Sequence, residues 1–194
     1  MKRSTLAIAA LVIAPSFAYA GTRLIGAATP TTVTDPVAAQ ATLDDPTIVA
    51  IFDAANTADI ETGTLAAERG HAKEVRDFGT MLARDHTQVR QLGRDLAQKL
   101  GVTPTPPKGD KSAADHTATM KRLRALSGTE FDHEFLRYEV TFHKNVIDAV
   151  NSTLLPAIKN AELKALVVKV APAFQAHMLA ADNLDKKLST AGSK

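Results

Sequence analysis

Apolar residues recur along most of this chain three or four positions apart, with polar residues between them. That spacing is typical of helices with one buried face, and the alternation of a strand does not occur. The pattern predicts four long helices and one short one. The expected helices are residues 44–69, 72–100, 112–126, 130–155 and 161–188.

Helices of this kind must cover their apolar faces against one another. The sequence therefore predicts an all-α protein, folded as an antiparallel four-helix bundle with one additional short helix. The bundle is expected to span residues 44–190. That length is sufficient for a single hydrophobic core.

The first 43 residues lack this pattern. Two basic residues follow the initiating Met, a short apolar run comes next, and an Ala-Tyr-Ala stretch ends at Ala20. Residues 1–20 are therefore expected to be a secretory signal peptide cut after Ala20, because the apolar run is too short to cross a bilayer. We expect a periplasmic protein with no transmembrane segment in its mature chain. Residues 21–43, rich in Thr, Ala and Pro, predict a flexible tether.

Charge and cysteine content narrow the function classes. The leader holds two of the 23 basic residues and none of the 21 acidic ones, so the mature chain is neutral. A neutral chain gives no electrostatic reason to expect nucleic acid as a partner. The chain has no cysteine, which excludes disulfides and thiolate ligands for a metal. The sequence does not fix the oligomeric state.

Titratable side chains interrupt the apolar face near the middle of every long helix. They are Asp59, His86, Glu139, His143 and His177. At 1.5 Å per residue, most of them lie about 20 Å along their helices. In an antiparallel bundle, residues near the middle of each helix lie at the same height along the bundle. The sequence predicts that they form one cluster in the core.

Three imidazoles and two carboxylates suit a transition metal ion, namely Fe, Mn, Zn or Cu. Glu139 is expected either to bind the ion or to orient His143, one turn further along the helix. Asp85, next to His86, and Asp132, on the same face as Glu139, are expected to support the site without binding the ion. The predicted role is metal handling or a redox or stress function.

The alternative hypothesis has no metal. Buried His–carboxylate networks can satisfy themselves by hydrogen bonds and fix the register of the helices. The protein would then be a non-enzymatic envelope or stress-related binding or structural module.

One established type of metal bundle does not fit. Di-iron carboxylate bundles use Glu-x-x-His on two helices, but Ala83, Val140 and Phe174 lie three residues before the candidate histidines. A mononuclear, His-rich site fits better. The chain has no hydrolase motif and no Gly-rich phosphate loop, so the sequence names no reaction.

Several segments resemble the DUF4142 family of exported, ferritin-like four-helix proteins of unknown function. They are residues 58–66, 75–86 with the ending Arg84-Asp85-His86, Ser127-Gly128 followed by Phe131-Asp132, His143, and Pro172 followed by His177. The resemblance covers residues 45–188.

The resemblance implies a ferritin-like fold and a location in the periplasm or envelope. It also singles out the core-facing set Asp59, His86, Asp132, His143 and His177. The family typically has Glu in place of Asp59, and the shorter acid must lie closer to any shared ligand. The resemblance implies no activity.

Overall fold

The computed structural model of the protein describes residues 43–191. The expected signal peptide, residues 1–20, lies outside the described residues, as does the expected tether apart from Leu43. From 43 to 191 the chain consists of helices and their connections and contains no strand. The prediction of an all-α protein is confirmed.

The helices follow the predicted pattern closely. They are α1 (Asp45–Arg69), α2 (Lys73–Lys99), α3 (Ser112–Arg124), α4 (Gly128–Ala149), the π-helix η1 (Val150–Leu154), α5 (Leu155–Ala157) and α6 (Ala161–Ala191). Four of the five predicted segments agree with α1, α2, α3 and α6 to within three residues at each end.

The segment predicted as one helix, residues 130–155, is different. It begins two residues earlier, at Gly128, and the structure divides it into α4, η1 and α5. Pro156 lies two residues after the last residue of η1, Leu154. Because proline has no N–H to donate, the regular hydrogen-bond ladder cannot continue through it, which favours a change of register here.

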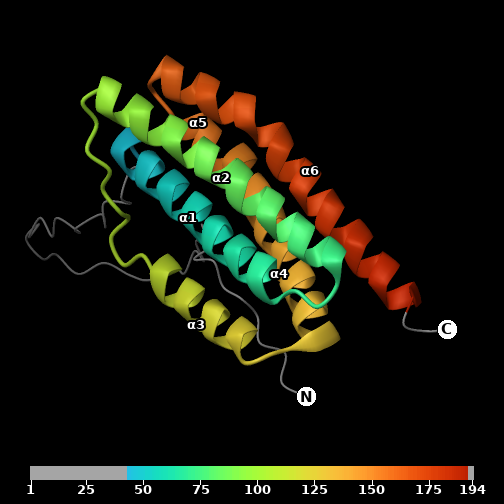
Figure 1. Ribbon diagram of the computed structural model, residues 1–194. Coiled ribbons are helices and arrows are strands. Elements are labelled where there is room, and N and C mark those ends of the chain that lie inside the picture. The colour runs from blue at the N-terminus through green and yellow to red at the C-terminus, as the bar shows by residue number, and fades with distance from the viewer. Residues whose placement is uncertain (1–42, 192–194) are drawn as a thin grey trace, which may run out of the picture.

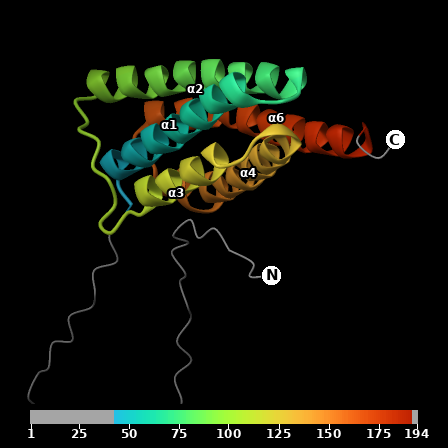
Figure 2. The same ribbon diagram turned by 60° about the horizontal axis from the view of Figure 1, so that its bottom comes forward.

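The four long helices lie side by side (Figures 1 and 2). α1 and α2 form one antiparallel pair joined by a short turn, and α4 and α6 form a second. Surface ion pairs at both ends, Lys99 with Glu162 and Lys187 with Glu74, show that α2 runs antiparallel to α6. The segment that contains α3 carries the chain back along the molecule, so α2 and α4 run in the same direction.

Two glycines bring α1 and α2 into close contact. A Cβ atom built on Gly63 would lie 2.8 Å from the Gly79 carbonyl oxygen, and one built on Gly79 would lie 2.6 Å from the Gly63 carbonyl oxygen. No side chain fits at either position without moving the backbone. This contact fixes the position of α1 relative to α2 on the turn side of Asp59 and His86.

The apolar core has two parts. One contains Phe78, Phe131 and Phe135 with their neighbours at the end where α2 and α4 begin. The other contains Ile48, Phe52 and Val167 with their neighbours at the opposite end. Burial of these side chains provides the main free energy that holds the helices together. The buried polar side chains come from the middle of the same helices.

By length and composition alone, residues Ala161–Thr190 of α6 suffice to cross a membrane, with a hydropathy of 1.2. In the folded chain α6 packs against α4 and α2 and buries Leu163, Val167 and Phe174. Helices that line the core of a bundle have similar length and composition.

Candidate metal centre

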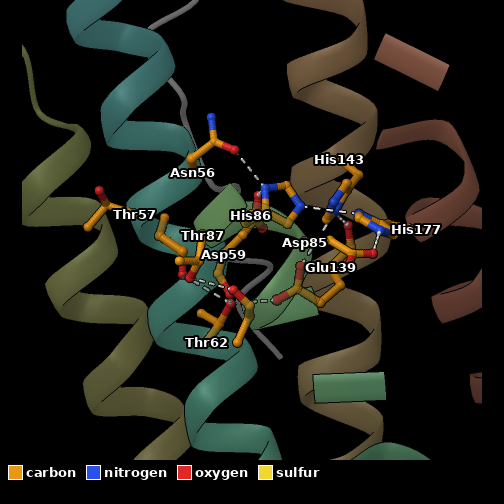
Figure 3. Close-up of polar contacts among 12 residues, drawn as sticks. Asn56, Thr57, Asp59, Thr62, Asp85, His86, Thr87, Glu139, His143 and His177 are labelled. Atoms are coloured by element: carbon orange, nitrogen blue, oxygen red, sulfur yellow. Dashed lines mark hydrogen bonds and ion pairs between the residues drawn. The ribbon is translucent and has the colours of Figure 1, made fainter. Parts of the chain in front are cut away.

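A layer of buried polar side chains crosses the middle of the helices. Its members are Asn56, Asp59 and Thr62 on α1, His86 on α2, Glu139 and His143 on α4, and His177 on α6. None of these residues, backbone and side chain together, is more than 6% exposed. Figure 3 shows these side chains turned toward one another. The structure therefore brings together all five residues that the sequence predicted as ligands.

The ligand atoms converge in two overlapping sets. In the first set, one nitrogen each of His86, His143 and His177 lie within 4.8 Å of one another. In the second, one atom each of Asp59, Glu139 and His143 meet the same limit. His143 belongs to both sets and is the centre of the layer.

Asn56 determines which nitrogen of the His86 ring carries the hydrogen. The Asn56 amide nitrogen donates to the Phe52 carbonyl oxygen at 2.7 Å, which leaves Asn56 Oδ1 facing His86 Nδ1 at 2.9 Å. An amide oxygen only accepts, so His86 Nδ1 carries the hydrogen. In the neutral ring, His86 Nε2 then keeps its lone pair.

Asp85 fixes the hydrogen on the His177 ring in the same way. His177 Nε2 lies 3.2 Å from Asp85 Oδ2, and a carboxylate accepts the hydrogen of that nitrogen. His177 Nδ1 then keeps its lone pair, and it lies 3.2 Å from His86 Nε2. With the two rings in these forms, two lone pairs face each other across a short gap.

His143 contributes the third nitrogen. Its Nδ1 donates to the Glu139 carbonyl oxygen at 3.0 Å, and its Nε2 is buried without a hydrogen-bond partner among the described residues. Burial lowers the pKa of His143, but the carboxylates of Asp59 and Glu139 outweigh burial and raise it to about 9. A metal ion that binds Nε2 at neutral pH must displace a proton from this ring.

His86 behaves in the opposite way. Burial, with the nearby charge of His143 and His177, lowers the pKa of His86 to about 2. Burial also lowers the pKa of His177. Both rings are therefore neutral at physiological pH, which is the form of imidazole that binds metals.

The two carboxylates are poorly satisfied. Neither oxygen of Asp59 accepts a hydrogen bond from the described residues, although Asp59 Oδ2 lies 3.3 Å from His86 Nδ1. The Thr62 hydroxyl donates to Glu139 Oε1 at 2.7 Å, but Glu139 Oε2 has no hydrogen-bond partner there. Burial raises the pKa of Asp59, and the charge of Glu139 raises it further. Buried acceptors without donors are costly, and they are suited to a cation.

The two supporting acids have different positions. Asp85 holds a histidine, as expected, but the histidine is His177 on α6 and not the adjacent His86. Asp132 lies at the turn between α1 and α2, where its oxygens accept the backbone N–H groups of His71 and Ala72, each at 2.8 Å. Asp132 therefore holds the turn that precedes α2 and is not part of the polar layer.

Sequence reasoning missed Asn56 and Thr62. The signal that would have found them is their spacing, because each lies three residues from Asp59 and so shares its helix face. Both orient members of the predicted cluster, Asn56 through His86 and Thr62 through Glu139.

Comparison with known proteins identifies the family. The family model described as "Domain of unknown function (DUF4142)" matches residues 31–184, which is most of the chain. Comparisons with curated proteins and with solved structures find no match. The protein belongs to the DUF4142 family.

Proposed function

We propose that this protein is an exported, ferritin-like four-helix bundle that binds one divalent transition metal ion in its polar layer. The ligands are His86, His143 and His177 together with a carboxylate of Asp59 or Glu139. Export is supported by the leader-like sequence of residues 1–20. The ferritin-like arrangement is supported by the single long connection between α2 and α4, which is characteristic of that fold.

The observation that carries the proposal is the set of hydrogen bonds behind the three histidines. The oxygens of the Asn56 amide, the Asp85 carboxylate and the Glu139 carbonyl each accept a hydrogen bond from one ring nitrogen. Each ring then directs its other nitrogen toward the same region. Metal-binding histidines in proteins are held by such hydrogen bonds on the nitrogen that does not bind the metal.

The spacing of the nitrogens fits an ion. His86 Nε2 and His177 Nδ1 are 3.2 Å apart. Two nitrogens bound at 2.0–2.1 Å to one tetrahedral ion lie roughly 3.3 Å apart. One nitrogen of His143 lies within 4.8 Å of one nitrogen of each of the other two rings, so a small inward movement of this ring completes a set of three nitrogens.

The carboxylates supply the charge that a buried cation requires. A divalent ion bound only by neutral imidazoles would leave two positive charges in the core, at a large desolvation cost. Asp59 and Glu139, both 0% exposed, offset that charge when both are ionised. Because His143 has one free nitrogen, only one ion at a time can use it, which favours a mononuclear site.

The donor set limits the metal to ions that accept nitrogen and oxygen. Without thiolates, Fe, Mn, Zn and Cu are the candidates. Metal handling, or a redox or stress role in the periplasm, is consistent with such a site.

Metal analysis of untagged protein purified from the periplasm tests the proposal. We expect one equivalent of a transition metal per chain. After chelation, we expect the melting temperature to rise on adding the metal, since 100 Kd of free ligand adds about 2.7 kcal/mol of stability. Protein without stoichiometric metal and without a rise in melting temperature for any of the four ions would contradict the proposal.

One variant separates this proposal from the structural alternative. If the layer only fixes helix register, a well-packed His86→Leu protein should be as stable as wild type or more so. If the layer binds metal, His86→Leu should remove most of the metal-dependent rise in melting temperature. His71→Leu, at an exposed histidine, is the matched control and should leave that rise unchanged.

A further inference from the structure

One face of α6 is apolar and is left uncovered by the folded chain. Only 28% of the most apolar stretch of this helix is buried. Val168 is 55% exposed and Leu179 is 48% exposed, although most large apolar side chains in the described part of the chain are covered. Ala165, Pro172 and Ala176 are also exposed and follow the same helical spacing, so they lie on the same face. An uncovered apolar face of this kind marks an interaction surface.

The edge of α2 next to α6 extends this face. Leu92, which is 44% exposed, lies two helical turns from Asp85 in one direction and from Lys99 in the other. Both of these residues contact α6, Asp85 through His177 and Lys99 through Glu162. Because residues seven positions apart share one side of a helix, Leu92 lies on the α6 side of α2 and adds to the apolar surface.

We propose that this face of α6 binds a second copy of the same chain, in an antiparallel pair with a two-fold axis beside Pro172. The inference does not depend on the metal-binding function proposed above. Val168 precedes Pro172 by four residues and Ala176 follows it by four, so the axis places Val168 at the level of Ala176 of the second copy. Leu179 and Ala165, each seven residues from Pro172, are matched in the same way. Each large side chain then lies at the level of a small one, which makes the face self-complementary, as a two-fold interface requires.

The charges at the edge of the face fit the same arrangement. Lys164 forms no ion pair with the described residues. Asp182 contacts Lys186 through Oδ2 and lies eighteen residues, or five helical turns, after Lys164, so both side chains leave the same edge of α6. The two-fold axis brings equal edges together, and Lys164 then lies about 3 Å along the helix axis from Asp182 of the second copy. The contact unites opposite charges, and symmetry forms it twice.

Pro172 leaves a backbone acceptor on this face that the pair can satisfy. Proline has no N–H, so the Val168 carbonyl lacks its helical donor. Gln175 is exposed and lies three residues after Pro172, so the axis places it within one residue of the level of Val168 in the second copy. Its side-chain amide is placed to donate to that carbonyl. The arrangement therefore pairs a polar group that it would otherwise bury.

Sedimentation equilibrium of the protein purified from the periplasm, at increasing protein concentration, tests the inference. Wild type should shift from monomer to dimer. Val168→Asp should weaken the dimer at least about tenfold, because it would bury an unpaired charge. Position 168 is exposed in the single chain, so the variant should fold, which circular dichroism checks. Ala54→Asp, which adds the same charge at an exposed position of α1 outside this face, is the matched control and should dimerise as wild type does.

Two charge variants test the antiparallel arrangement itself. Lys164→Glu and Asp182→Lys should each dimerise about tenfold more weakly than wild type, because like charges meet at both edge contacts. An equimolar mixture of the two variants should recover the association of wild type, since every edge contact between the two kinds of chain again unites opposite charges.

Four results would overturn the proposal. A wild-type chain that stays monomeric at every concentration has no such interface. A wild-type monomer that co-sediments with phosphatidylglycerol vesicles uses the face for a lipid surface instead. A Val168→Asp protein that dimerises as wild type does places the interface elsewhere. A mixture of the two charge variants that associates no better than either alone contradicts the antiparallel pair.

Discussion

The two sides of the polar layer differ in how their atoms are satisfied. On one side, His86 and His177 hydrogen-bond to Asn56 and Asp85, which fix both rings. On the other side, both Asp59 oxygens, Glu139 Oε2 and His143 Nε2 lack hydrogen-bond partners among the described residues. Leaving a buried polar atom unpaired costs about 1–3 kcal/mol. The first side is preorganised by hydrogen bonds, and the second leaves buried acceptors for the cation that we propose.

The largest effect on metal binding is expected at Asp59, on the side of the layer whose buried atoms lack hydrogen-bond partners. Asp59→Asn should weaken metal binding by at least about 100-fold, because it removes an ionised carboxylate beside the ion. The same change should destabilise the chelated protein by about 1–3 kcal/mol at neutral pH, because it removes a carboxylate that holds the proton of the buried His143. Calorimetric titration and urea unfolding measure the two effects. An Asp59→Asn protein that binds metal as tightly as wild type would show that the Asp59 carboxylate does not contact the ion.

On the hydrogen-bonded side, Asn56→Ala should act through His86. Loss of the amide oxygen frees the His86 ring to rotate and to exchange its hydrogen between nitrogens, so we expect metal affinity to fall by about 10- to 100-fold. Asn151→Ala, at an exposed position, is the control and should bind metal as wild type does. Unchanged affinity in Asn56→Ala would mean that the two sides do not differ in preorganisation.

The pH dependence of stability distinguishes the two sides without mutation, because His143 on one side and His86 on the other have pKa values shifted in opposite directions. The unfolded chain loses the His143 proton near pH 6.5, but the folded chain keeps it to about pH 9, so stability should fall as pH rises from 6.5 to 9. Folded His86 resists protonation down to about pH 2, so stability should also fall as pH drops below 6.5. Each slope is at most about 1.4 kcal/mol per pH unit for one group.

Urea unfolding of the chelated protein across this range measures both slopes. His143→Leu should abolish the alkaline slope and leave most of the acid one. A stability that stays flat between pH 6.5 and 9 would contradict a protonated His143.

The smallest effect on metal binding is expected from Asp132→Asn. This acid is as buried as the layer but has both oxygens occupied by backbone N–H groups. Losing the charge and one acceptor should cost about 1 kcal/mol of stability, as for a helix cap, with metal affinity within about threefold of wild type. A large loss of affinity would place Asp132 among the residues that support the site.

The helices and the polar layer were predictable because both depend on position along a helix. Periodicity gave the helix bounds, and equal depth placed Asp59, His86 and His143 at one level. Contacts between helices were harder to predict, because they depend on how each helix is rotated and on which helix is its neighbour. For this reason the partner of Asp85 proved to lie on α6, and Asp132 proved to hold a turn instead of the site.

The long connection between α2 and α4 divides the site between two halves of the chain. The α1–α2 hairpin brings Asn56, Asp59 and His86, and the α4–α6 hairpin brings Glu139, His143 and His177. An ion bound by both would act as a clasp, because the hairpins could not separate without releasing it. The bound ion would then slow the unfolding of the whole bundle, because it must be released before the hairpins separate. Slow unfolding limits attack by proteases.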